Sequence, residues 1–436
     1  MPAVTRIGLA FGAFGALLCV GGAAAADIRV WEEHPESVWK NRNLDITGYL
    51  QPGYIQRQDD PDGQNPHEDD NFWLQRARFG LRSRVHRFVW VRMEYDATVS
   101  QLEDGYLEAR FLEQLNLRFG QFQIPFLKTF MFSEVNLAFN DRAVYTPLQQ
   151  DRETLRYLRP RDLGFMLSGR VGDVTPKATT PVLEYWAGMF LGQGQGATNN
   201  IDDAYLYSAR IQLHTLGVPD GVEAESDLAR NESPRVGIAA GVYSNCDDRG
   251  QWNRGWTADA ELRWQGVYVS GSFVWFKNGA ASGLGETLGY GADTACGRGP
   301  AAGGPPDHIA SGMSAQAQYV LPKFVPEQKH SFELLARFDQ VNPQSPCNAV
   351  TGKCKFLGGG PSTPGYLIPA SYEDADNPPT RYRITAGLNW FPDDRQTLRL
   401  SLNYQINREA EDVQNANGTF TGIKNDVIWF QATAGL

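Results

Sequence analysis

The stretch from Phe72 to His86 has two faces of opposite character when it is laid out as a β-strand. Side chains in a strand point alternately to either side. One face carries Trp73, Ala77, Phe79, Leu81 and Val85, and the other carries Arg76, Arg78, Arg82, Arg84 and His86. Four arginines do not fit an ordinary core, because unpaired buried charges are costly. The pattern predicts a barrel strand with lipid on one side and a water-filled lumen on the other, with the solvated face of a soluble antiparallel sheet as the alternative.

The same two-residue period recurs along the rest of the chain. From Leu44 onward, segments of about ten residues, the length that crosses a bilayer as a tilted strand, alternate with turn residues. The sequence therefore predicts an all-β fold, a transmembrane antiparallel β-barrel of about 16 strands over residues 44–436. The last segment alternates up to Leu436 and is expected to close the barrel against the first strand.

The connections between these segments differ in length in a regular way. Short ones, such as the turn at Arg87, alternate with long ones rich in glycine, proline and aspartate, such as residues 58–70, 277–311 and 342–380. Outer-membrane barrels have short turns on the periplasmic side and long outer loops. One connection breaks the rule, because the acidic stretch Thr215–Pro234 follows a strand on the turn side and could carry a short helix.

The first 26 residues have the features of a cleaved secretory signal. Arg6 precedes an apolar run, and Ala24–Ala26 form a small-residue cleavage site before Asp27. Residues 27–43 are then a short N-terminal segment. Removal of Arg6 changes the formal charge from -10 to -11, which argues against nucleic acid as a partner. The expected location is the outer membrane of a Gram-negative-type bacterium.

The cysteines and the catalytic motifs give little sign of chemistry. Cys347 and Cys354 lie close enough in the sequence to form a disulfide in an exported protein. A zinc site is disfavoured because the cysteines have no C-x-x-C spacing and no nearby histidine. G-x-S-x-G, H-E-x-x-H and a phosphate-binding glycine loop are absent. We therefore expect no enzyme, no metal and no cofactor, with an outer-membrane lipase or protease as a much less favoured reading.

The connection from Pro125 to Pro160 is the third outer loop and has an unusual composition. It combines aromatic residues with the bases Lys128, Arg142 and Arg152. A loop this apolar is expected to fold inward, to bury its aromatic rings against the wall and to leave its charges at the opening. With the arginines of residues 72–86 it would make a positively biased constriction, because guanidinium groups hold phosphate and carboxylate oxygens well. The alternative is that lumen carboxylates such as Glu94, Asp96, Glu108, Asp259 and Glu261 neutralise these bases.

The order of segments resembles the phosphate-selective porin O and P family. The resemblance rests on F-W-L-Q-R-A-R-F-G-L-R-S-R from Phe72, L-E-D-G-Y-L-E-A-R from Leu102, R-F-G-Q-F-Q-I-P-F from Arg118 and L-G-F-M-L-S-G from Leu163. It implies a trimeric outer-membrane porin of sixteen strands in which lumen bases conduct anions. These roles transfer to Arg76, Arg78, Arg82, Arg84 and Arg118, and to Lys128 in the loop. A lysine-rich vestibule is not evident, and the chain ends in leucine where such barrels commonly end in phenylalanine.

The sequence thus predicts a passive diffusion channel for small anionic solutes such as phosphate, embedded in outer-membrane lipid. One alternative is a general or sugar-passing porin with a charge-neutral lumen. Another is a structural or adhesive barrel that binds an outside partner through its long loops.

Overall fold

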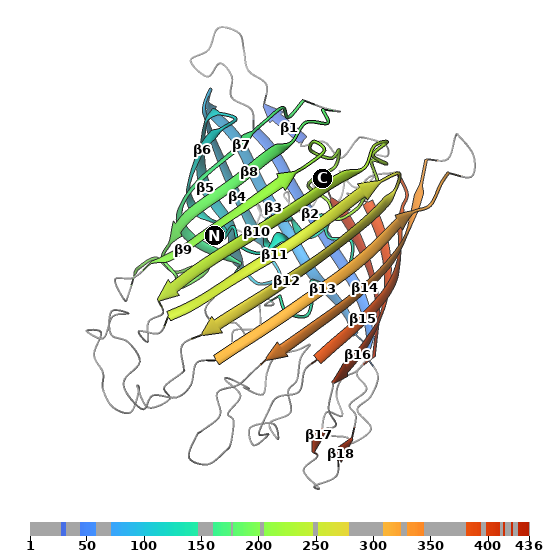
Figure 1. The fold of residues 1–436 in the computed structure, drawn as a ribbon. Coiled ribbons are helices and arrows are strands. Elements are labelled where there is room, and N and C mark those ends of the chain that lie inside the picture. Colours follow the sequence, from blue (N-terminus) through green and yellow to red (C-terminus); the bar gives the residue numbers. More distant parts are fainter. Residues whose placement is uncertain are drawn as a thin grey trace, which may run out of the picture.

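The computed structural model describes residues 28–31, 44–57, 71–146, 160–175, 178–200, 205–246, 252–278, 308–323, 329–343, 381–393, 398–409, 413–414, 420–421 and 426–435. Sixteen strands of this part of the chain form one closed antiparallel barrel (Figure 1). The prediction of an antiparallel barrel of about sixteen strands is confirmed.

The barrel strands follow one another around the ring in sequence order. They are β2 (Leu44–Arg57), β3 (Asn71–His86), β4 (Val89–Asp96), β5 (Gln101–Leu112), β6 (Leu115–Gln123), β7 (Arg161–Val171), β8 (Val182–Phe190), β9 (Leu206–His214), β10 (Arg235–Cys246), β11 (Trp252–Trp264), β12 (Val267–Asn278), β13 (His308–Val320), β14 (Ser331–Pro343), β15 (Arg381–Phe391), β16 (Leu398–Glu409) and β19 (Val427–Gly435). Two further short strands, β17 (Val413–Gln414) and β18 (Phe420–Thr421), pair only with each other.

The ring closes between the last and the first barrel strand. Val427 pairs with Arg57, and Gly435 pairs with Tyr49. The short strand β1 (Ile28–Trp31) pairs with the start of β2, where Ile28 lies opposite Ile46. Closure matters because an open strand edge would leave backbone N–H and C=O groups without hydrogen bonds in lipid.

The barrel is apolar outside and polar inside, which is the reverse of a soluble protein. On β16, Leu402 is 48% exposed, whereas its neighbours Ser401 and Asn403 are 1% and 0% exposed. The same alternation exposes Phe119 on β6 and Ile384 on β15 and buries Arg383. The outward face suits hydrocarbon and the inward face suits water and polar groups.

A β-bulge in β3 corrects the predicted faces of the opening segment. The pairing with β2 shifts between Gln51 and Pro52, so that Arg76 lies opposite Gln51 but Leu74 lies opposite Pro52. An extra residue in one strand of a pair reverses the facing of everything before it. Trp73 therefore points inward, with its ring 5.3 Å from that of Trp429, and not outward with Phe79 as predicted.

The arginines that follow the bulge keep the predicted inward facing. A second shift between Arg84 and His86 ends the regular pairing at the turn. His86 is exposed there, beside the ring of Phe88.

The main buried apolar cluster lies inside the barrel and not between two layers. It joins Phe122, Ile124, Phe126 and Phe130 to wall residues that include Tyr243 and Phe276. The connection after β6 carries a single turn of helix, α2 (Lys128–Met131), and a 3-10 turn, η1 (Glu134–Asn136). In the described part of the chain, no helix is long and apolar enough to cross a membrane.

Candidate functional site

Residues 124–146, which follow β6 and are called the inner segment here, pack against the inward faces of many strands. Phe126 is fully buried, and its ring centroid lies 4.8 Å from that of Tyr243 on β10 and 6.0 Å from that of Phe276 on β12. Its carbonyl oxygen accepts a hydrogen bond from Arg210 Nη1 at 3.1 Å. The aromatic rings of this stretch are thus buried against the wall.

The charges of the inner segment do not stay at an opening, which corrects that part of the prediction. Lys128 is only 9% exposed, and its Nζ lies 2.8 Å from Glu261 Oε2 and 2.6 Å from the Tyr268 hydroxyl. Arg142 is equally buried, with Nη2 3.0 Å from Glu134 Oε1. Buried charges need such partners, because removal from water costs several kcal/mol per ion.

Glu134 is the centre of the largest ion-pair network. Its Oε2 lies 2.6 Å from Arg78 Nη1, and its Oε1 pairs with Arg142. Arg78 also contacts Asp96 at 2.9 Å, Glu94 at 3.3 Å and Glu103 at 3.4 Å. The network therefore ties the middle of the inner segment to β3, β4 and β5.

The second half of the inner segment is held by other strands of the ring, β14, β15 and β19. Asp141 Oδ1 lies 2.7 Å from Arg337 Nη2 on β14, and its other oxygen pairs with Arg383 on β15. Asn140 Nδ2 donates to the carbonyl of Trp429 at 3.1 Å. Segment and wall are thus joined by hydrogen bonds to charged groups, which are stronger than those between neutral groups.

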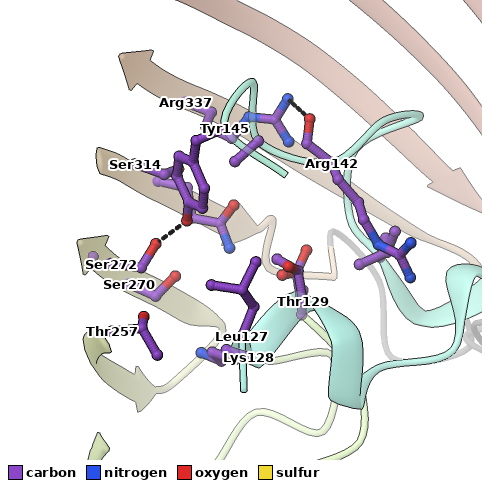
Figure 2. Close-up of a pocket in the computed structure, with 15 residues that line it drawn as sticks. Leu127, Lys128, Thr129, Arg142, Tyr145, Thr257, Ser270, Ser272, Ser314 and Arg337 are labelled. Atoms are coloured by element: carbon purple, nitrogen blue, oxygen red, sulfur yellow. Dashed lines mark hydrogen bonds between the residues drawn. The ribbon is translucent and has the colours of Figure 1, made fainter. Parts of the chain in front are cut away.

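A polar cavity lies between the inner segment and strands β11 to β14 (Figure 2). Its hydroxyl and amide lining comes from Thr129, Thr257, Ser270, Ser272, Ser314 and Gln316, and its charged lining comes from Lys128, Arg142, Glu225 and Arg337. In Figure 2 the hydroxyl of Tyr145 points to Ser272, with which it forms a hydrogen bond. This cavity is the candidate constriction, because loop and wall groups face one another across it.

Arginines gather on the wall of β3 to β6 in the half nearest the short turns. This arginine band consists of Arg82, Arg84, Arg92, Arg110 and Arg118. The guanidinium carbons of Arg82, Arg110 and Arg84 lie 4.7, 5.1 and 5.8 Å from the ring centroid of Trp90. Arg118 lies 4.3 Å from the ring centroid of Tyr106. Aromatic faces stabilise cations without neutralising them, so the band keeps its positive charge.

Three carboxylates of the described residues form ion pairs with the arginine band, and Asp45 lies opposite Arg82 in the pairing of β2 with β3. Glu108 pairs with Arg118 at 2.7 Å and with Arg110 at 2.5 Å. Arg92 reaches Glu94 at 2.7 Å and Asp104 at 3.5 Å, which lie toward the Glu134 network. Within the described residues, no carboxylate forms an ion pair with Arg82. The arginine band therefore keeps positive charge at Arg82, whereas Lys128, Arg142 and Arg337 at the cavity are each held by a carboxylate.

Comparison with known proteins decides which family this barrel represents. The family model described as phosphate-selective porin O and P matches residues 47–432. The chain belongs to this family. The resemblance found in the sequence between Gly48 and Val171 is thus confirmed over nearly the whole chain, and the protein is an outer-membrane porin.

Solved structures of other outer-membrane proteins are similar to this porin at low sequence identity. OmpT expressed in the outer membrane of Vibrio cholerae is 9% identical, with a TM-score of 0.51, over 94% of this chain and 100% of that chain. The outer membrane channel DcaP of Acinetobacter baumannii is 11% identical, with a TM-score of 0.47, over 91% and 98% of the two chains. OprB of Pseudomonas putida is 10% identical, with a TM-score of 0.46, over 91% and 94%. The search of curated proteins gave no match.

The porin places most of the predicted site residues on the inward face. Arg76 donates to Gln51 Oε1 at 2.9 Å, and Arg78, Arg118, Lys128 and Arg142 are held in the ion pairs described above. Arg152 lies outside the described residues, as do Cys347, Cys354 and residues 1–26. No cluster of metal-binding side chains occurs in the described part.

Sequence reasoning missed Glu225 and Arg337, which line the cavity from connections and strands far along the chain. Arg337 lies on a segment in which apolar and polar residues clearly alternate, so its position on the inward face could be predicted from the sequence. Nothing in the sequence marked Glu225 as part of the same cavity as Lys128.

The lowered pKa values of two carboxyl groups of the inner segment predict that the porin responds to acid only at low pH. Burial alone would raise the pKa of Glu134, but Arg78, Arg142 and Arg161 hold it well below its usual value of 4.5. Burial would also raise the pKa of Asp141, but Arg383 and Arg337 lower it below its usual value of 3.8. A carboxyl group whose pKa is lowered by folding stabilises the folded state at pH values above its unfolded-state pKa. This stabilisation is lost as the pH falls through the folded-state pKa.

We therefore expect Glu134 to anchor the inner segment unchanged from about pH 8 down to about pH 5. The difference in single-channel conductance between the wild type and Glu134→Gln should be constant over this range and should shrink only below about pH 4. A difference that disappears between pH 7 and pH 5 would contradict the lowered pKa.

Proposed function

We propose that this porin is a passive diffusion channel for small anionic solutes such as phosphate. The single observation that carries the proposal is the arginine band, in which Arg82 has no ion-pair partner in the described residues and lies over the ring of Trp90. Side-chain exposures of 44% for Arg110 and 24% for Arg118 leave them open to the lumen. Several moderate sites in a row pass an anion along, whereas one tight site would trap it.

We further propose that the inner segment is the inward-folded third outer loop and that it narrows the lumen. Its contacts with β3, β11 and β14 support this role, because these strands lie on different sides of the ring. Solutes would then pass beside it, through the cavity lined by Ser270, Ser272 and Ser314.

A second candidate function is a general or sugar-passing pore. The observation in its favour is the cavity itself, where hydroxyl groups predominate and Lys128, Arg142 and Arg337 are each held by a carboxylate. A structural or adhesive barrel is the third reading, and it predicts little conductance. Its outer loops at residues 279–307 and 344–380 lie outside the described residues.

The test is the reversal potential of the refolded porin in a planar bilayer under a salt gradient. We expect anion preference that falls about fivefold in Arg82→Glu, because two units of charge at about 8 Å in water change the energy of an ion by about 1 kcal/mol. Arg408→Glu is the matched control, because Arg408 lies far from the arginine band at the end of β16 and pairs with Asp426.

Each other outcome of this experiment has a definite meaning. Cation preference or no preference in the wild type would remove the anion assignment and favour the general pore. A folded barrel without conductance would favour the structural or adhesive reading.

We also propose that residues 1–26 are cleaved and that the porin assembles as a homotrimer, as the family resemblance implies. Mature protein beginning at Asp27 in amino-terminal sequencing, and a trimer mass in detergent, are the expected results. An uncleaved amino terminus or a monomer mass would remove the respective proposal.

A further inference from the structure

The centre of the connection between β9 and β10, residues 215–234, is buried although the connection lies on the side of the short turns. It forms a series of turns and no helix, which corrects the helix considered from its sequence. Glu225 is 5% exposed, Asp227 is 0% exposed and Asn231 is 4% exposed. A surface connection would be solvated, so the centre of residues 215–234, which are together called the turn-side segment here, lies in the interior.

The turn-side segment is anchored to the inward faces of β11 and β14. Arg263 Nη1 donates to the carbonyls of Gly221 at 2.6 Å and Ser226 at 3.0 Å. The Ser226 hydroxyl donates to Glu333 Oε1 at 2.5 Å. Asp227 Oδ2 accepts the N–H of Gly266 at 2.6 Å, which fixes the segment to the β11–β12 turn.

The tip of the turn-side segment meets the inner segment. The Glu225 N–H donates to the carbonyl of Asn136 at 2.9 Å. The Ala138 N–H in turn lies 3.4 Å from Glu225 Oε2. Glu225 is thereby held at the cavity that Lys128 and Arg142 line from the inner segment.

Glu225 differs from the other charges around this cavity. Lys128 is paired with Glu261, Arg142 with Glu134, and Arg337 with Asp141 and Asp339. Glu225 has no ion pair within 4.0 Å in the described residues, although Arg337 and Arg399 act on it electrostatically from further away. A buried carboxylate without a close cation is costly, and here it faces the space through which solutes pass.

We propose that Glu225 is a specificity-determining residue that sets the charge limit of the constriction. The arginine band draws anions to the turn-side mouth, and Glu225 then opposes their passage in proportion to their charge. Divalent anions are held back more than monovalent anions and zwitterions. The inference rests on the proposed function as a diffusion channel and adds the valence of the solutes that pass.

The experiment compares sulfate with chloride as probes in planar bilayers. Reversal potentials between potassium sulfate and potassium chloride give the sulfate-to-chloride permeability ratio. We expect Glu225→Gln to raise this ratio about threefold, since one charge at about 8 Å acts twice as strongly on a divalent ion. Glu225→Asp keeps the charge and should keep the wild-type ratio. Glu223→Gln, at an exposed position two residues earlier, is the matched neutral control.

A second variant separates charge from folding. Glu225→Cys is labelled after insertion into the bilayer, and its sulfate-to-chloride permeability ratio is compared with that of labelled wild type. A negatively charged sulfonate reagent should restore a low ratio, whereas a positively charged ammonium reagent should leave the ratio high. Equal ratios in the wild type, Glu225→Gln and Glu223→Gln would overturn the role of Glu225. A wild type that prefers cations would overturn the proposed function alone, because the Glu225→Gln shift would still be measured.

Discussion

Replacement of Glu134 by glutamine should raise the single-channel conductance of this porin about twofold and make the open current noisy, because an unfilled barrel of sixteen strands leaves a wide aqueous channel. Glu134 joins Arg78 of β3 to Arg142 of the inner segment. Removal of one partner from a buried ion pair costs about 3–5 kcal/mol. Such a loss shifts the balance between docked and undocked segment more than about a hundredfold.

The matched control for this variant is Asp173→Asn in the exposed turn after β7. In the described residues, the Asp173 carboxylate accepts hydrogen bonds only from Thr175. Its Oδ1 lies 3.0 Å from the amide nitrogen and 2.6 Å from the hydroxyl oxygen of Thr175. Its conductance should equal that of the wild type. A quiet, wild-type conductance in Glu134→Gln would show that the other contacts hold the inner segment without this network.

The second large effect is expected from Gly312 on β13. A Cβ atom at this position would lie 2.3 Å from Cβ of Tyr145, so the end of the inner segment must move. Overpacking of this kind costs about 1–3 kcal/mol. Gly312→Ala should lower the free energy of unfolding in denaturant by that amount and break the Tyr145–Ser272 hydrogen bond that borders the cavity.

Gly271→Ala on the neighbouring strand is the control for Gly312→Ala. A Cβ at Gly271 meets only the Ser314 carbonyl, at 3.8 Å. This variant should unfold like the wild type. An equal loss of stability in both variants would mean that the strands, and not the Tyr145 contact, respond to the added methyl group.

The barrel could be predicted from the sequence because many strands repeat a two-residue period, and because short turns alternate with long loops as in outer-membrane barrels. The side of the barrel to which Trp73 points could not be predicted from the sequence, because the bulge before Arg76 depends on the pairing with β2. The pairing of Arg118 with Glu108 follows from adjacent strands and was among the alternatives considered.

The candidate site was less accessible to sequence reasoning for a physical reason. Lys128 and Glu261 lie 133 positions apart, and no local pattern brings them together. Glu225 reaches the cavity because Arg263 holds the backbone of the turn-side segment and the N–H of Gly266 holds the side chain of Asp227. Long-range contacts of this kind are set by the closed ring and not by periodicity.

The two interior segments also act as a brace across the ring. Around its circumference the barrel is held by strand-to-strand hydrogen bonds, which do little to stop a wide cylinder from flattening. The inner segment is tied to β3 through Glu134 and to β11 through Lys128, and these strands lie half the circumference apart in the strand order. The hydrogen bond from the Glu225 N–H to the Asn136 carbonyl adds a further tie, from the end of the barrel that carries the short turns. We expect these ties across the ring to oppose flattening of the barrel under lateral pressure from the lipid.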